Sequence, residues 1–138
     1  MPVDIPKFFR SVRFALKGLR VMIFSENNAR IHLIATGMVV VLALFLNVSK
    51  RDWVSLLIAI VLVWVTELIN TAIEKTVDMV SPEYRKIAGD IKDLAAGAVL
   101  VAALFAVVIG VLTFKDYVPW EDWAYQLHLL KPEVEPEF

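Results

Sequence analysis

Two uncharged apolar runs constrain the fold of this chain more than any other feature of its sequence. They extend from Ile31 to Ser49 and from Leu94 to Phe114. As helices that rise about 1.5 Å per residue, they would be roughly 28 and 31 Å long, which matches a hydrocarbon core of about 30 Å. All six prolines lie outside both runs, as continuous helices require. The runs therefore predict two membrane-spanning helices.

A third apolar run, Trp53 to Thr66, is too short to cross a bilayer by itself. It would form about 21 Å of helix and fall about 9 Å short of the far boundary. A helix that completes the crossing must carry Glu67 and Asn70 to the edge of the hydrocarbon. Because a carboxylate is costly at that depth, its presence indicates a functional site. We therefore expect an all-α membrane protein with three transmembrane helices.

The composition agrees with a membrane protein. Hydrophobic residues make up 59% of the 138 residues, and the mean hydropathy is +0.67. A soluble domain with this composition would expose large apolar patches. The chain has no cysteine, which excludes disulfides, thiolate nucleophiles and zinc–cysteine sites. Its net charge of -1 provides no overall field that would attract nucleic acid.

Lysine and arginine are distributed unequally between the two sides of the predicted membrane domain. Residues 1–30 and the loop 75–93 together hold ten of the 14 basic residues. Three spans place these two segments on the same side, and the positive-inside rule makes that side cytoplasmic. We therefore predict a cytoplasmic N-terminus and an extracytoplasmic C-terminus.

Residues 1–30 are predicted to form an amphipathic helix on the membrane surface, followed by a three-span domain over 31–114 and an extracytoplasmic tail over 115–138. On a helical wheel, five basic residues share one arc and large apolar residues cover the opposite arc. The basic residues are Lys7, Arg10, Arg13, Lys17 and Arg20. Phe14 lies beside the basic arc, either as a stray aromatic residue or as a platform for a nucleobase.

The third membrane helix is predicted to begin well before the bilayer. Ser81 and Pro82 suit its N-cap and first position, so that its cytosolic part carries Asp90, Lys92 and Asp93. Small residues on this helix suit close packing against other helices. They are Gly89, Ala95, Gly97, Ala98, Ala102 and Ala106.

A polar stripe follows the short apolar run. Glu67, Asn70, Glu74 and Asp78 are three, four and four residues apart, which places them on one helical face. Glu74 would lie about 10 Å further into the cytosol than Glu67. That separation suits a reaction between a lipid hydroxyl at the interface and a water-soluble phosphate chain. The structural alternative, for any single residue of the stripe, is a hydrogen bond between helices.

Phosphoryl transfer requires a divalent metal, a cation on the phosphates and a group that positions the nucleophile. Glu74 and Glu26 are candidate Mg²⁺ ligands, because magnesium binds one or two carboxylates together with phosphate oxygens. Lys92 offers a point charge for phosphate. Glu67 suits a general base for a lipid hydroxyl, and Asn70 is placed to orient that hydroxyl.

The sequence contains no phosphate-binding loop of the soluble kinases, so side chains and the metal would have to hold ATP. Arg30 and His32 remain open between structural and functional roles. Beyond the last span, Trp120, Trp123 and Tyr125 suit an interfacial aromatic anchor.

Three segments of the chain resemble the bacterial integral membrane diacylglycerol kinase/undecaprenol kinase family. The stretch from Glu67 to Asp78 is similar to its E-x-x-N-x-A-I-E-x-x-x-D signature. Lys92 to Val99 resembles its second motif and Glu26 to His32 its first, all with the family's spacing. The resemblance covers roughly residues 7–114. It implies a homotrimer in the bacterial cytoplasmic membrane that phosphorylates a lipid alcohol with Mg²⁺ and ATP, at sites shared between subunits.

The resemblance also implies roles for individual residues. Glu67 is the general base, assisted by Asn70, and Glu67 and Ala96 contact the lipid substrate. Glu26 and Glu74 hold Mg²⁺. The nucleotide-binding set comprises Lys7, Phe14, Glu26, Glu74, Asp78, Glu83, Tyr84, Arg85, Lys92 and Asp93.

The lipid substrate has two candidates. The residues of the motifs, together with His32, resemble the Gram-positive branch of the family, which prefers undecaprenol. Diacylglycerol is the alternative substrate. Two other classes of protein remain as rivals. A small transporter would use Glu67 as a titrating group deep in the bilayer, and a purely structural helix oligomer would have no kinase activity.

Overall fold

The computed structural model describes residues 4–83 and 85–118 of the protein, and these residues form four helices. They are α1 (Ile5–Ser25), α2 (Asn27–Phe45), α3 (Lys50–Val80) and α4 (Lys86–Phe114). The last three are long and apolar enough to cross a membrane. The prediction of an all-helical chain with three candidate spans is therefore confirmed. Trp120, Trp123 and Tyr125 lie outside the described residues.

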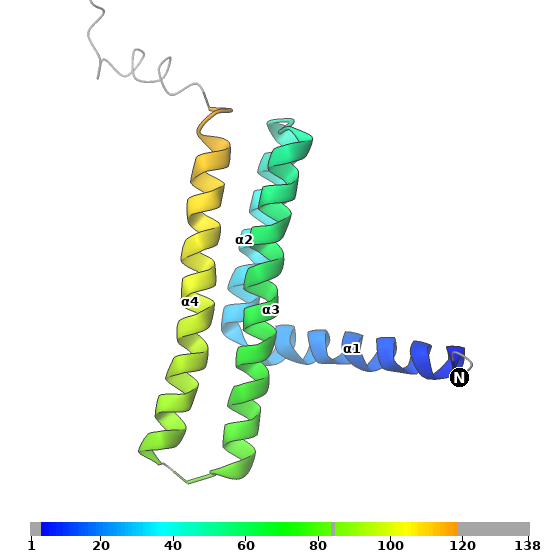
Figure 1. Cartoon of the computed structure of the whole chain (residues 1–138), viewed down its shortest axis with the longest axis vertical. Helices are drawn as coiled ribbons and strands as arrows, with labels where there is room; N and C mark the ends of the chain where they lie inside the picture. The colour runs from blue at the N-terminus through cyan, green and yellow to red at the C-terminus, as the bar shows by residue number, and fades with distance from the viewer. Residues whose placement is uncertain (1–3, 84, 119–138) are drawn as a thin grey trace, which may run out of the picture.

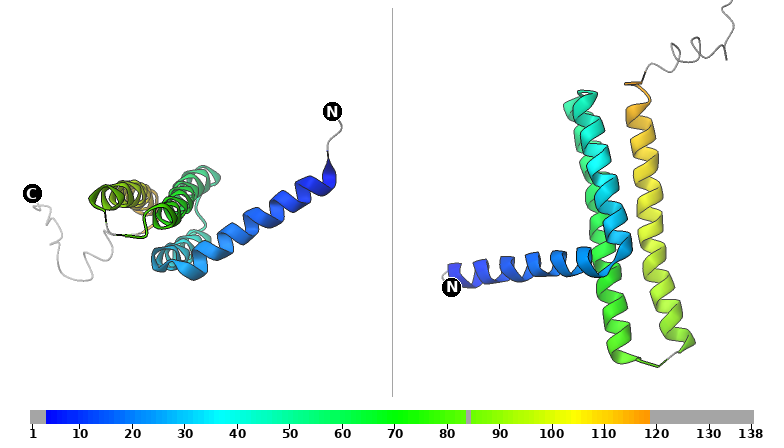
Figure 2. Two further views of the ribbon diagram at one scale, coloured as in Figure 1. Left: turned by 90° about the horizontal axis from the view of Figure 1, so that it is seen from below. Right: turned by 180° about the vertical axis from the view of Figure 1, so that it is seen from behind.

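Helix α3 is the centre of the bundle (Figure 1). It runs side by side with α4 over nearly the whole length of both helices and also contacts α2 and the end of α1. Helix α1 extends crosswise from the bundle, and its N-terminal end lies far from the other helices (Figure 2). The chain thus consists of an upright three-helix bundle with one projecting arm.

Helices α3 and α4 are longer than a bilayer is thick. The 31 residues of α3 rise about 46 Å, compared with a hydrocarbon core of about 30 Å. The end of α3 and the start of α4 continue past the level of α1 (Figure 1). As the short apolar run predicted, α3 continues through Glu67 and Asn70 without a break. Helix α4 begins at Lys86, which places Lys92 and Asp93 in its first two turns.

The elbow between α1 and α2 is fixed by hydrogen bonds. Glu26 adopts an extended conformation that ends α1, and its backbone N–H still donates to the carbonyl of Met22. The Arg30 guanidinium donates to the carbonyls of Ile23 (3.2 Å) and Phe24 (2.7 Å), two of the carbonyls that the end of α1 leaves free. Arg30, whose role the sequence left open, therefore fastens the arm to the bundle.

Two predicted helix boundaries are wrong. The first span does not extend to Ser49: α2 ends at Phe45, and Asn47 takes a left-handed turn (φ 50°) that asparagine tolerates better than most residues. Ser49 instead caps α3, since its hydroxyl accepts from the N–H of Asp52. Ser81 does not begin the next helix; it ends α3, and Arg85 is the residue that precedes α4.

Small side chains on α4 pack against α3, but the glycines do not contribute. Ala95, Val99 and Ala102 are four and three residues apart, share one face and are buried. A methyl group added at Gly89 or Gly97 would meet no atom within 4 Å. The predicted small-residue face is therefore correct for the buried alanines, whereas neither glycine is needed for close approach within this chain.

A hydrogen-bond clamp closes the end of the bundle farthest from α1. The Tyr117 hydroxyl donates to the Asp52 carboxylate and accepts from the backbone N–H of Ser49 at 2.9 Å. The clamp lies beside a cluster of the buried side chains Ala43, Val48 and Leu56. It ties the end of α4 to the turn between α2 and α3.

We expect Tyr117→Phe to lower the free energy of unfolding by about 1 kcal/mol, because it removes both hydrogen bonds and keeps the ring. Thermal unfolding in detergent micelles measures this, with Asp116→Asn as an exposed neighbouring control. An unchanged melting temperature in Tyr117→Phe would mean that the clamp does not stabilise the bundle.

Candidate active site

The polar stripe of α3 changes from buried to exposed along the helix. Glu67 and Asn70 expose 1% and 5% of their surface, Glu74 is half-buried, and the Asp78 side chain is 65% exposed. The buried members face neighbouring helices, and the exposed one lies on the part of α3 that continues past α1. The stripe thus leads from the interior of the bundle to its projecting end.

Glu67 is buried without a hydrogen-bond partner. Neither carboxylate oxygen has a partner among the described residues, and the same is true of Asn70 Oδ1. Its electrostatic neighbours are two further carboxylates, those of Glu74 and Glu26. Burying a polar group without a hydrogen bond is costly, and burying a charge is costlier still. Packing within the described chain therefore leaves the hydrogen-bonding capacity of Glu67 unused.

Glu67 and Asn70 form part of a groove of about 220 Å³ between three helices. Helix α2 contributes Asn28, Ile31 and His32, and α4 contributes Ala96, Val99, Leu100 and Ala103. All the polar side chains of the groove come from α2 and α3, whereas the α4 wall is apolar. Ile31 and Leu100 are 55% and 60% exposed. The groove therefore has a polar floor, an apolar wall and exposed apolar residues, an arrangement that suits an amphiphile with a polar end.

Contacts between charged and polar side chains connect the stripe to the other helices. Asn70 Nδ2 donates to Glu74 Oε1 at 3.0 Å within α3. The Lys92 ammonium of α4 pairs with the Asp78 carboxylate. On the other side of α3, Lys75 Nζ lies 3.3 Å from Glu26 Oε1 at the elbow. The structure thus links four of the predicted site residues on α3 and α4 in two separate pairs, and it joins Glu26 to Lys75 of α3.

The carboxylates of Glu26 and Glu74 fit a magnesium ion by their chemistry. Oxygen ligands from one or two carboxylates are what Mg²⁺ takes from a protein when phosphate and water complete its coordination. Both carboxylates act electrostatically on Glu67, and Glu26 forms an ion pair with Lys75. Over residues 4–83 and 85–118, no three acidic or histidine side chains converge into a metal-binding cluster.

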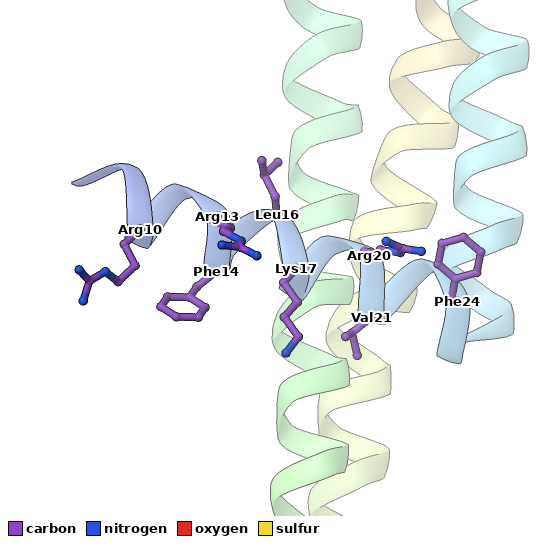
Figure 3. Close-up of a pocket in the computed structure, with 8 residues that line it drawn as sticks. All are labelled: Arg10, Arg13, Phe14, Leu16, Lys17, Arg20, Val21 and Phe24. Atoms are coloured by element: carbon purple, nitrogen blue, oxygen red, sulfur yellow. The ribbon is translucent and has the colours of Figure 1, made fainter. Parts of the chain in front are cut away.

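The arm carries Phe14 and Lys7 to different distances from the stripe. Phe14 is 63% exposed and borders a hollow between α1 and α3 that Leu68, Thr71 and Lys75 also line. Its ring and the Lys17 side chain point toward the same side as the projecting ends of α3 and α4, whereas Leu16 points the opposite way (Figure 3). Lys7 lies in the first turn of α1. That end of α1 projects away from the bundle (Figure 2), so the structure does not bring Lys7 to the stripe.

The remaining predicted nucleotide residues lie at the projecting end. Glu83 and Arg85 are exposed in the connection between α3 and α4, and Asp93 is exposed on α4. Tyr84 lies outside the described residues. Arg85 borders a hollow between α3 and α4 that is otherwise lined mainly by apolar side chains. The structure does not assemble these residues around Glu74 within one chain.

Sequence reasoning missed Asn28 as a groove residue and left His32 open. Both lie in the first two turns of α2, where the spacing of four residues places them on one face. The sequence contained this signal, since the two polar residues are four positions apart at the start of the helix. It gave no indication that this face turns toward Glu67.

Comparison with known proteins identifies the family of the chain. A family model described as prokaryotic diacylglycerol kinase matches residues 13–114. The undecaprenol kinase of Bacillus subtilis (strain 168) is 33% identical over 111 residues, which cover 80% of this chain and 90% of the relative. The diacylglycerol kinase of Escherichia coli (strain K12) is 33% identical over 102 residues, 74% of this chain and 84% of the relative.

A third relative is the diacylglycerol kinase of Synechocystis sp. It is 37% identical over 106 residues, which cover 76% of this chain and 61% of the relative. The matched segment includes Glu26, all four residues of the α3 stripe and Lys92. The chain belongs to the prokaryotic diacylglycerol kinase family and is a membrane lipid kinase.

Proposed function

We propose that this chain transfers the γ-phosphoryl group of ATP to the hydroxyl group of undecaprenol in the bacterial cytoplasmic membrane. Membership of a kinase family implies ATP as the co-substrate. The observation that carries the proposal is the Glu67 carboxylate, which is 1% exposed and has no partner in the described chain, in a groove with an apolar wall. A lipid hydroxyl in that groove supplies the missing hydrogen bond.

Glu67 acts as the general base in this proposal. The hydroxyl proton passes to the Glu67 carboxylate while the hydroxyl oxygen forms a bond to the γ-phosphorus, and the bond from that phosphorus to ADP breaks. Asn70 lies one turn away with its Oδ1 unpaired among the described residues. This oxygen can only accept, so it orients the hydroxyl by sharing the hydroxyl proton with Glu67 before that proton is transferred. Ala96, on the α4 wall of the groove, contacts the lipid.

The nucleotide binds on the side of Glu67 toward which the stripe becomes exposed. Glu26 and Glu74 hold Mg²⁺, which neutralises charge on the phosphates when it is bound. Lys92, now paired with Asp78, is within reach of the same region and supplies a cation for phosphate. The exposed residues Asp93, Glu83 and Arg85, together with Tyr84, border the nucleotide.

The α4 wall favours undecaprenol over diacylglycerol. A polyprenol carries one oxygen at the end of a hydrocarbon chain. Diacylglycerol carries two ester groups beside its hydroxyl, and their carbonyl oxygens lose hydrogen bonds to water when they are buried. Four apolar residues form the α4 wall and offer no side-chain donor to an ester.

The active protein is a homotrimer in this proposal, with α1 on the cytoplasmic membrane surface. The outer half of α1 projects away from its own bundle (Figure 2), so Lys7 reaches a nucleotide only on a neighbouring subunit. The basic side chains of α1 carry the charge that the positive-inside rule assigns to the cytoplasm. A shared site also brings the exposed loop residues of one subunit to the stripe of another.

The depth of Glu67 argues against a transporter. Glu67 lies 17 residues, about 25 Å, along α3 from Lys50 but only eight residues, about 12 Å, from Lys75 at the elbow. A group that titrates during transport is expected near the bilayer centre, whereas this carboxylate lies toward the end of the span where α1 joins.

Transfer of radiolabelled phosphate from ATP to undecaprenol and to diacylglycerol, side by side in mixed micelles, tests the proposal. We expect faster transfer to undecaprenol. Faster transfer to diacylglycerol would contradict the proposed substrate, and no transfer to either lipid would contradict lipid kinase activity.

A further inference from the structure

We infer that His32 binds the hydroxyl group of the lipid substrate from the α2 side of the groove, opposite the apolar wall of α4. This inference rests on the proposed function and adds a substrate-binding residue to it. His32 lines the same groove as Glu67 and Asn70 and lies on a different helix. Two helices thus present polar groups to one small space, and the third presents hydrocarbon.

The hydrogen bonding of His32 differs from that of a structural polar residue in a membrane helix. Such residues find partners on neighbouring helices or on their own backbone. One turn further along α2, Thr36 does so, accepting from Trp64 Nε1 of α3 at 3.0 Å. On α3, the Thr66 hydroxyl donates to the carbonyls of Leu62 and Val63. His32 is half-buried and makes no hydrogen bond to any residue in 4–83 or 85–118.

A lipid hydroxyl can satisfy both sides of the groove at once. The hydroxyl has one proton to donate and two lone pairs. Its proton goes to Glu67, one lone pair forms the bond to phosphorus, and the other accepts an N–H from the imidazole. His32 neither gains nor loses a proton in this arrangement. Its effect is to hold the oxygen in place, because the Glu67 carboxylate, which can only accept, fixes the hydroxyl from the proton side alone.

The wall opposite His32 determines where the rest of the lipid lies. Ala96, Val99, Leu100 and Ala103 offer no polar side-chain atom, so the hydrocarbon chain of the substrate lies along α4 while its hydroxyl turns toward α2 and α3. A donor on the α2 wall therefore affects the affinity for the lipid and leaves the affinity for the nucleotide unaffected.

Two substitutions separate substrate binding from a structural role. His32→Leu removes the donor and keeps an apolar side chain in the groove, whereas His32→Gln keeps an N–H donor at similar reach. We expect His32→Leu to raise the KM for undecaprenol in mixed micelles about tenfold, the loss of one hydrogen bond. The KM for Mg-ATP should stay unchanged, and His32→Gln should recover most of the loss. Ile34→Ala, an exposed position on the same helix, is the matched control and should match the unsubstituted protein.

The outcomes distinguish this inference from the proposed function. An unchanged undecaprenol KM in His32→Leu would overturn the role of His32. Equal increases in the KM values for lipid and ATP, with no recovery in His32→Gln, would overturn it as well and indicate a structural residue. The proposed function is tested in the same assay by phosphate transfer in the unsubstituted protein and its loss in Glu67→Gln. These two results do not depend on His32, so the proposed function can hold when the inference about His32 fails.

Discussion

Replacing Glu67 with glutamine will lower the turnover number by about 100- to 10,000-fold, the range that a general base contributes. The amide has the same shape as the carboxylate but cannot accept the hydroxyl proton. Nucleotide binding and subunit assembly should be retained, since the residue lies in the interior of the bundle and makes no hydrogen bond to other described residues. Radiolabelled phosphate transfer to lipid, together with equilibrium binding of a non-hydrolysable ATP analogue, measures both quantities.

The stability of Glu67→Gln provides a second readout. A buried carboxylate without partners destabilises the fold, so its neutral isostere should leave the melting temperature unchanged or raise it. Asp90→Asn, an exposed acidic position on α4, is the matched control and should retain full turnover. Full turnover in Glu67→Gln would reject the assignment of the base, and loss of folding would show that the carboxylate has a structural partner.

Replacing Glu74 with glutamine will raise the Mg²⁺ concentration needed for half-maximal activity by about 10- to 100-fold. Mutations that merely perturb the surroundings of a metal ligand weaken metal binding by that factor, and Glu74 is assigned as a ligand itself. Glutamine can still accept the hydrogen bond from Asn70 Nδ2, so the substitution removes charge rather than the contact within α3. Mn²⁺ binding followed by electron paramagnetic resonance in the presence of the ATP analogue gives a readout independent of turnover.

Glu67→Gln is the control for this measurement, because it also neutralises one acidic residue of the stripe. Its Mn²⁺ affinity, measured by electron paramagnetic resonance because the variant has little turnover, should change less than that of Glu74→Gln. If the requirement of Glu74→Gln equals that of the unsubstituted protein, Glu74 does not hold the metal.

Much of the fold follows from where charge interrupts the apolar sequence. The first and third spans are runs without charge, and the shortness of the run before Glu67 required α3 to carry that residue into the bundle. The helix ends were harder to predict. Ser81 and Pro82 suit the start of a helix, but a serine can also end one, and local sequence does not distinguish the two when five residues separate α3 from α4.

The candidate site was predictable along one helix and not between helices. Spacing places Glu67, Asn70, Glu74 and Asp78 on one face of α3, but it does not say which residues of α2 and α4 that face meets. His32 shares a groove with Glu67 because the chain turns at Glu26 from the arm into the bundle. Periodicity within either helix carries no information about that turn.

The central claim is that a lipid hydroxyl binds between the Glu67 carboxylate and the terminal phosphate of the nucleotide. The most direct test is an experimental structure of the protein with Mg²⁺, a non-hydrolysable ATP analogue and undecaprenol. We predict that the hydroxyl oxygen lies within hydrogen-bond distance of Glu67, about 3 Å, on the side facing the γ-phosphate. A lipid hydroxyl bound elsewhere, with neither metal nor phosphate near Glu67, would contradict this account.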